Sequence, residues 1–173
     1  MGLRDLIDGL MLVLGADAQS WHLQSQPIIA RHPVLPHRTG VRPRILLAED
    51  NVVNQKVACR TLEKLGYRVD VAQDGEAAVK AWESGRYDLI LMDCQMPVLD
   101  GYAATREIRR RESAGRRIPI IALTAHAMKG ADIVCKDAGM DEHLTKPINR
   151  PELDACLRRY LSEQHNHVTP SSA

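Results

Sequence analysis

An α/β fold with a five-stranded parallel sheet is the class that this sequence predicts, on two observations. First, short apolar runs alternate with helical patterns five times between residues 44 and 163, as in the strand–helix units of a doubly wound sheet. Second, runs such as LILM and IPIIAL are apolar throughout, which indicates strands covered on both faces. With 45% apolar and 26% charged residues, a chain of 173 residues can build one such core.

The elements follow in order along the chain. Strands are predicted at residues 45–48, 69–72, 89–92, 118–123 and 143–145. After the first strand, helical spacing groups Val53, Val57, Leu62 and Leu65 on one face, and Gly66 ends the helix. The four later helices are predicted from apolar residues at helical spacing: Ala77, Ala78, Ala81 and Trp82; Ala104 and Ile108; Ala127, Ala131, Val134, Cys135 and Ala138; Leu153, Cys156, Leu157, Tyr160 and Leu161.

Three zones divide the chain. Residues 1–42 form an N-terminal extension or linker with room for one short helix, because prolines at 27, 33, 36 and 43 break regular structure. Residues 43–163 form the α/β domain. Residues 164–173 are polar and small, and they are predicted to be a disordered tail.

Charge, cysteine content and hydropathy exclude several classes of protein. The 23 Lys and Arg residues against 22 Asp and Glu give a net charge of +1, which favours neither nucleic acid nor an anionic membrane. The six arginines within residues 106–117 are predicted to be a solvated surface. The four cysteines form no C-x-x-C pair, and no apolar run approaches the roughly 20 residues of a membrane helix. We therefore expect a cytoplasmic protein that contacts neither nucleic acid nor membrane.

Polar residues stand directly after the predicted strands, where parallel strands bring ligand-binding groups to one edge. After the first, third, fourth and fifth strands come, respectively, Glu49 and Asp50; Asp93; Thr124, Ala125 and His126; and Lys146 and Pro147. Three converging carboxylates repel one another unless a cation joins them, and their hard oxygens suit Mg²⁺. Lys146 would add a point charge and Thr124 a hydroxyl donor for phosphoryl oxygens.

Other phosphate-binding arrangements do not fit the sequence. No G-x-x-x-x-G-K-[ST] loop is present, and no G-x-G-x-x-G follows the first strand. A carboxylate that accepts a phosphoryl group is therefore favoured over a nucleotide cradle. Taken singly, Asp50 is also compatible with a helix N-cap, Asp93 with a turn residue and Lys146 with a surface lysine. Asp100 and Gly101 form a turn pair that is predicted to cap the next helix.

Four stretches in the order ILLAEDNVVNQ, LILMDCQMPVLDG, IIALTAHAMKG and AGMDEHLTKPI resemble the response-regulator receiver domains of two-component phosphorelays. They are most similar to receivers attached to hybrid sensor histidine kinases. The resemblance implies a flavodoxin-like strand order 2-1-3-4-5. It also implies that Asp93 is phosphorylated by a phosphohistidine, and that Glu49, Asp50, Asp93 and the backbone carbonyl of Gln95 hold Mg²⁺.

Further roles are implied by the same resemblance. Lys146 neutralises the phosphoryl group, Thr124 moves to hydrogen-bond it, and the Lys146–Pro147 peptide is cis. Gln95 and His126, with Ala125 beside them, tune hydrolysis of the acyl phosphate. His143 stands where the family often has a switch Tyr or Phe, so an imidazole would take that place.

The expected partners are a histidine kinase, a histidine phosphotransfer domain or both. A homodimer could form through the face made by residues 127–138, 143–145 and 153–161. We expect a domain that catalyses the transfer of a phosphoryl group from a donor to itself and has autophosphatase activity. It would act either as a stand-alone receiver or as part of a hybrid kinase. Two alternatives remain: a docking module that is never phosphorylated, and a phosphohydrolase. The second usually has an Asp two residues after the nucleophile, where this chain has Gln95.

Overall fold

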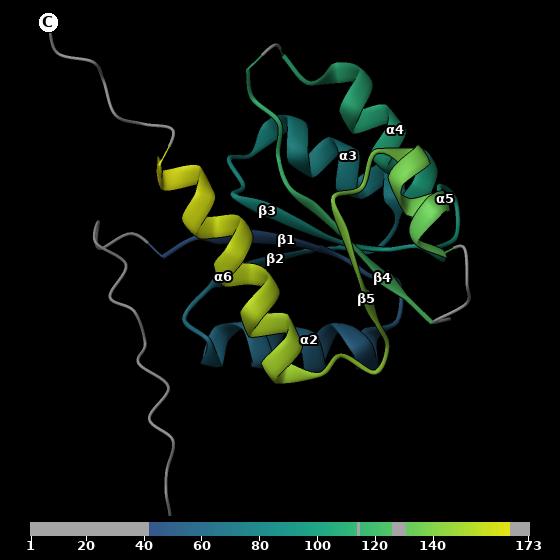
Figure 1. Cartoon of the computed structure of the whole chain (residues 1–173). Coiled ribbons are helices and arrows are strands. Elements are labelled where there is room, and N and C mark those ends of the chain that lie inside the picture. The colour runs from purple at the N-terminus through teal and green to yellow at the C-terminus, as the bar shows by residue number, and fades with distance from the viewer. Residues whose placement is uncertain (1–41, 114, 126–130, 167–173) are drawn as a thin grey trace, which may run out of the picture. The chain divides into compact units, whose positions relative to one another are not determined.

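The computed structural model describes residues 42–113, 115–125 and 131–166, and within them five strands alternate with five helices (Figure 1). All strand pairs are parallel, and the sheet order is β2-β1-β3-β4-β5. The predicted fold class and strand order are therefore confirmed. The bounds are β1 (Arg44–Ala48), α2 (Val52–Lys64), β2 (Arg68–Ala72), α3 (Gly75–Ser84), β3 (Leu89–Asp93), α4 (Gly101–Arg111), β4 (Ile120–Thr124), α5 (Ala131–Ala138), β5 (Glu142–Thr145) and α6 (Arg150–Asn166).

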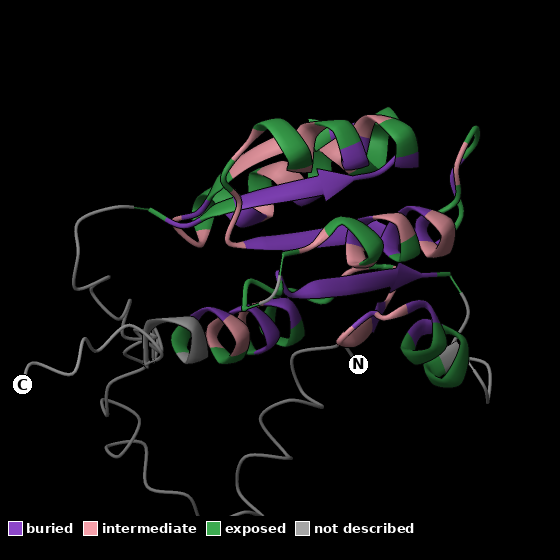
Figure 2. Ribbon diagram, turned by 90° about the horizontal axis from the view of Figure 1, so that it is seen from above, coloured by how far each residue is buried: buried purple, intermediate pink, exposed green. Residues whose placement is uncertain are grey.

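The helices cover the sheet on both faces, with α3, α4 and α5 on one side and α2 and α6 on the other (Figure 1). Buried residues, drawn in purple, are concentrated on the strands between these helices (Figure 2). The central strands β3 and β4 are buried along their whole length, as strands with two covered faces must be. Alternate residues of a strand point to opposite faces. Leu46 and Ile90 therefore pack against α3 and α4, whereas Ile45 and Leu91 pack against α2 and α6.

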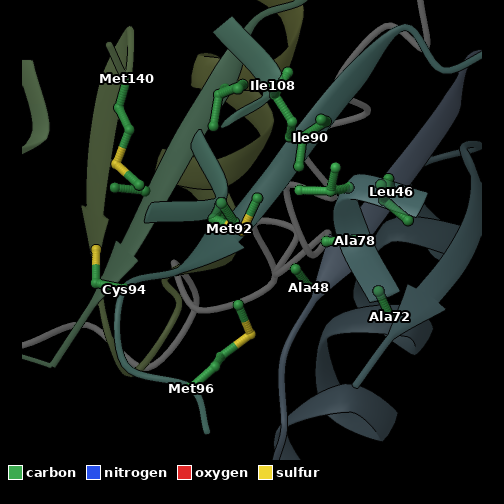
Figure 3. Close-up of a cluster of buried hydrophobic side chains, with 14 of the residues drawn as sticks. Leu46, Ala48, Ala72, Ala78, Ile90, Met92, Cys94, Met96, Ile108 and Met140 are labelled. Atoms are coloured by element: carbon green, nitrogen blue, oxygen red, sulfur yellow. The ribbon is translucent and has the colours of Figure 1, made fainter. Parts of the chain in front are cut away.

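The core under α3, α4 and α5 is built from aliphatic and sulfur-containing side chains (Figure 3). The chain has no phenylalanine, so branched aliphatics and methionines fill the volume that rings take in many cores. Met92, Met96 and Met140 are buried in this cluster. Flexible thioethers of this kind fill irregular gaps between smaller core side chains.

Capping residues fix where three helices begin. Asn51 caps α2, because its side-chain oxygen accepts hydrogen bonds from the backbone N–H groups of Val53 and Asn54. Asp74 and Asp100 cap α3 and α4 in the same manner. The helix cap is therefore Asn51 and not its neighbour Asp50. The expected turn pair that begins α4 is confirmed.

The prediction of which residues form the buried face of α2 is wrong. Val53 and Val57 are 69% and 60% exposed, whereas Ala58 and Leu62 are buried against the sheet. Val53 and Leu62 are nine residues apart, which is about two and a half helical turns, so they lie on opposite sides. The helix thus presents apolar side chains to the core and also to its outer surface.

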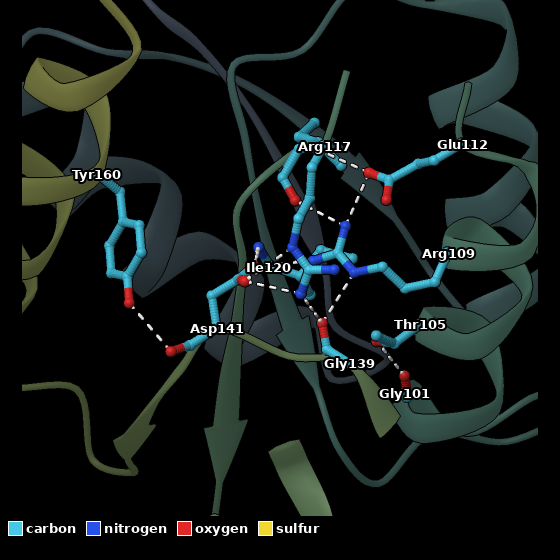
Figure 4. Close-up of polar contacts among 10 residues, drawn as sticks. Gly101, Thr105, Arg109, Glu112, Arg117, Ile120, Gly139, Asp141 and Tyr160 are labelled. Atoms are coloured by element: carbon cyan, nitrogen blue, oxygen red, sulfur yellow. Dashed lines mark hydrogen bonds and ion pairs between the residues drawn. The ribbon is translucent and has the colours of Figure 1, made fainter. Parts of the chain in front are cut away.

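One arginine of the run at residues 106–117 is not solvated, which corrects the prediction for that position. The Arg109 guanidinium donates to the carbonyls of Gly139 and Ile118, both at 2.8 Å, and to carboxylate oxygens of Glu112 and Asp141, both at 2.7 Å (Figure 4). Its side chain is only 12% exposed. These bonds join the end of α4 to the strand entrances of β4 and β5.

The structure describes the ends of the domain but not the segments predicted to lie beyond them. Helix α6 continues to Asn166, past the predicted boundary at residue 163. The predicted extension, up to residue 41, and the tail from residue 167 lie outside the described residues. Among the helices that the structure describes, none combines the length and apolar character needed to cross a lipid bilayer.

Candidate functional site

Three carboxylates meet at the carboxyl edge of the sheet, as the sequence predicts. Asp93 is the last residue of β3, and Glu49 and Asp50 follow β1. One carboxylate oxygen from each lies within 4.8 Å of the others. Glu49 and Asp93 are 2% and 5% exposed, whereas Asp50 is open to solvent. The cluster therefore combines two buried acids with one that solvent reaches.

Lys146 joins the two buried acids. It directly follows β5, and its Nζ lies 2.6 Å from both Glu49 Oε2 and Asp93 Oδ2. Burial lowers the pKa of Lys146, but its hydrogen bonds to Asp93 and Glu49 outweigh that effect, so the net pKa lies above the ordinary value. The lysine is therefore a permanent positive charge between two acids.

Asp93 is held at both carboxylate oxygens. Oδ2 accepts from Lys146, and Oδ1 accepts from the backbone N–H of Gln95 at 3.0 Å. Burial raises the pKa of Asp93, and these two hydrogen bonds offset the rise only in part. A Cβ on Gly101 would lie 2.1 Å from the Asp93 carbonyl oxygen, so only glycine lets the start of α4 come this close to the end of β3.

Glu49 is fixed from α2 as well as from Lys146. Asn54 Nδ2 donates to Glu49 Oε1 at 2.9 Å, and Gln55 Nε2 donates to the Glu49 backbone carbonyl at 2.6 Å. Sequence reasoning missed both amides as site residues. The available signal was the pair NQ in the first turns of the helix that directly follows the acidic pair.

Comparison with known proteins decides the family. The model of the response regulator receiver domain family matches residues 45–158, which is most of the described domain. The chain belongs to this family. The receiver domain of a Pseudomonas aeruginosa sensor histidine kinase, solved with magnesium coordinated in its active-site cleft, is 54% identical. It aligns with a TM-score of 0.65 over 70% of this chain and 99% of that one.

Two further matches show related contexts. The peroxide stress-activated histidine kinase mak1 of Schizosaccharomyces pombe is 43% identical over 123 residues, which cover 68% of this chain and 8% of the kinase. This chain therefore spans a small part of that kinase's length. In Saccharomyces cerevisiae, the receiver domain of Ssk1 was solved with the histidine phosphotransfer protein Ypd1. It is 30% identical, with a TM-score of 0.66 over 71% of this chain and 91% of that one.

The donor set of this receiver domain fits a magnesium ion. All three clustered groups offer hard oxygen ligands, which Mg²⁺ prefers over nitrogen or sulfur. Asp50 is exposed and is not used as a helix cap, so its carboxylate can face a cation that keeps several waters. Fold, acidic cluster and family together make the chain a receiver domain of the two-component phosphorelay type.

The remaining predicted site residues are placed as follows. Thr124 ends β4 and is 6% exposed, and its carbonyl accepts from the Lys146 N–H at 2.8 Å. Ala125 is exposed, and His143 is half-buried in β5, in register with Ala122. The Lys146–Pro147 peptide is cis, as expected. His126 lies outside the described residues.

Proposed function

We propose that Asp93 is the phosphoacceptor of this receiver domain and takes its phosphoryl group from a phosphohistidine. One observation carries the proposal: a buried carboxylate at the end of β3 contacts a lysine at 2.6 Å inside a cluster of three acids. An Asp93 oxygen attacks phosphorus and the phosphorus–nitrogen bond breaks. The electron pair of that bond stays on the imidazole, which takes a proton from solvent.

Two side chains would meet the charge that the phosphoryl group brings. Lys146 already contacts Asp93 Oδ2, so its ammonium is close enough to pair with an oxygen of a group attached to that carboxylate. The Thr124 hydroxyl, at the end of the neighbouring strand, would donate to another oxygen. Gln95, His126 and Ala125 are proposed to set how fast water hydrolyses the acyl phosphate.

The cation would be held by Glu49, Asp50, Asp93 and the backbone carbonyl of Gln95. When bound there, Mg²⁺ supplies positive charge to the transferring phosphoryl oxygens. The protein's own contribution is to orient its carboxylates in advance. Lys146 and the Gln95 N–H fix the orientation of the Asp93 carboxylate before any donor arrives.

The outer surface of α2 is the proposed docking site for the donor, a histidine phosphotransfer domain or a histidine kinase. Val52, Val53 and Val57 are exposed on this helix, and Val98 is exposed in the loop that follows Asp93. Helix α2 and this loop begin beside the acids, so a donor that reaches Asp93 covers them. Apolar residues grouped on one helix are typical of a contact surface.

Further parts of the signalling cycle are proposed. Phosphorylation would shift the domain between two conformations, with Thr124 and His143 carrying the change to the face made by α5, β5 and α6. Exposed Ile133 and Val134 on α5 would support a homodimer at this face. We place the domain in the cytoplasm, where a reducing environment keeps its free cysteines as thiols.

Intact mass spectrometry after incubation with acetyl phosphate and Mg²⁺ tests the proposal. The wild type should gain the mass of one phosphoryl group, and Asp93→Asn should gain none. Asp100→Asn is the matched control, because this aspartate lies in the same loop as an exposed helix cap. EDTA should abolish the adduct on the wild type and on Asp100→Asn.

Two results would contradict the proposal. Labelling of Asp93→Asn would place the acceptor elsewhere. The other is the absence of both an adduct and beryllofluoride binding on the wild type. Beryllofluoride binding, followed by ¹⁹F NMR, is measured as well because fast hydrolysis of the acyl phosphate would hide the adduct. Failure of both assays would favour the docking module that is never phosphorylated.

A further inference from the structure

Every oxygen of Glu49 accepts a hydrogen bond from a side chain. Lys146 Nζ contacts Oε2 at 2.6 Å, Asn54 Nδ2 contacts Oε1 at 2.9 Å, and Gln55 Nε2 contacts the backbone carbonyl at 2.6 Å. The side chain of Glu49 is 2% exposed, so water cannot supply these bonds. A buried carboxylate needs such donors, because desolvation without them is costly.

The two amides differ from the lysine in charge. A carboxamide donates a hydrogen bond without a net charge, so Asn54 orients the Glu49 carboxylate and leaves its negative charge available to a cation. A second ammonium at this position would neutralise the acid instead. Gln55 acts on the main chain, and its bond fixes the peptide that joins Glu49 to Asp50.

The helix start explains why these two positions reach the acid. Asn51 is the N-cap of α2, so Asn54 and Gln55 are the third and fourth helical residues. In a capping box the third residue reaches back to the cap. Here Asn54 reaches past the cap to Glu49, whose Oε1 also lies 3.4 Å from the Asn51 N–H.

We infer that Asn54 and Gln55 are positioning residues of the cation site. Asn54 fixes the carboxylate of Glu49, and Gln55 fixes its backbone, so that Glu49 and Asp50 face the cation together. The inference rests on the proposed magnesium site. Partners that orient metal ligands typically change metal affinity by about 10- to 100-fold when they are removed.

The test measures the dissociation constant of Mn²⁺ by electron paramagnetic resonance, with Mg²⁺ as competitor, on the folded wild type and four variants. Asn54→Leu removes the donor and keeps the number and branching of the side-chain heavy atoms, and Asn54→Gln keeps an amide on a longer stem. Gln55→Met removes the second amide. Thr61→Val is the matched control, because the Thr61 hydroxyl bonds only within α2, to the Val57 carbonyl at 2.8 Å.

We expect Asn54→Leu and Gln55→Met to weaken cation binding at least about tenfold. Asn54→Gln should recover part of the loss, and Thr61→Val should bind as the wild type does. Unchanged affinity in Asn54→Leu and Gln55→Met would overturn the inference. The inference would also be overturned if these variants had a lower urea midpoint in EDTA but an unchanged cation affinity in the folded state. That result would mean that the two amides have a structural role alone. A wild type that binds no cation would instead refute the proposed magnesium site itself.

Discussion

Replacing Arg109 with methionine tests how strongly one buried guanidinium holds the domain together. Arg109 reaches from α4 to the segment before β4 and to the turn between α5 and β5 (Figure 4). Methionine keeps much of the aliphatic stem and removes the charge and all four hydrogen bonds. The variant therefore isolates the polar contribution from the packing of the stem.

The expected loss follows from what each acceptor keeps. Glu112 still accepts from the Ile118 N–H at 2.7 Å, and Asp141 still accepts from the Ile120 N–H at 2.8 Å and keeps its ion pair with Arg117 at 2.9 Å. Removing one member of a buried ion pair costs about 3–5 kcal/mol when the other is left uncompensated. Because both carboxylates keep a donor, we expect a value near the lower limit, about 3 kcal/mol.

Urea denaturation followed by far-UV circular dichroism measures this loss as a shift in midpoint at constant slope. The control is Arg110→Met, one residue along the same helix. The Arg110 side chain is 69% exposed and pairs with Glu107, and exposed pairs of this kind contribute little. Equal midpoints for the two variants would refute the assigned role of Arg109. Arg109→Lys should not restore stability, because an ammonium cannot reproduce the planar fork of donors.

Three further predictions concern Gly101, Asp93 and the cysteines. Gly101→Ala should lower the free energy of unfolding by about 1–3 kcal/mol and slow phosphorylation, because the new Cβ would lie 2.1 Å from the Asp93 carbonyl oxygen. A variant with the same urea midpoint and the same labelling rate as the wild type would contradict this. In EDTA, the Asp93 carboxyl carbon should titrate by NMR above 3.8, because burial raises its pKa, and Mg²⁺ should lower the midpoint. The stability that depends on this group is then present at low pH and lost as pH rises through the raised pKa; a midpoint at or below 3.8 in EDTA would be inconsistent with the burial. Burial raises the pKa of Cys94 to about 12 and of Cys156 to about 11, so iodoacetamide should label half-exposed Cys59 first, and peptide mapping that finds equal rates would argue against this.

The sheet and the meeting of the acids could be predicted because both depend on local pattern and on strand direction. Apolar runs marked each strand to within about two residues. The largest difference is at β4, which begins at Ile120 and not at residue 118, where Pro119 has no N–H for the strand ladder. Residues that follow parallel strands must share one edge, so Asp93 and Lys146 could be placed together without knowledge of their side chains.

What could not be predicted depends on which way side chains point in the folded domain. Val53 and Arg109 show opposite errors: an apolar residue of α2 is exposed, and one arginine of a basic run is buried. Residue type alone gives neither result, because neighbouring elements decide which face of a helix is covered. The contact from Asn54 to Glu49 likewise needs the exact start of α2, which Asn51 determines by capping.

Lys146 is shared between two carboxylates, and this sharing sets the charge balance of the site. Three carboxylates and one ammonium leave two formal negative charges, which a single divalent cation cancels. A phosphoryl group on Asp93 would bring about −1.5 to −2 in place of the single carboxylate charge. With the cation bound, phosphorylation would therefore replace a neutral balance by an excess of negative charge, and nearby donors such as the Thr124 hydroxyl would be attracted to it. In a site with a second lysine, that lysine would neutralise part of the phosphoryl charge, and the attraction of donors elsewhere in the domain would be weaker.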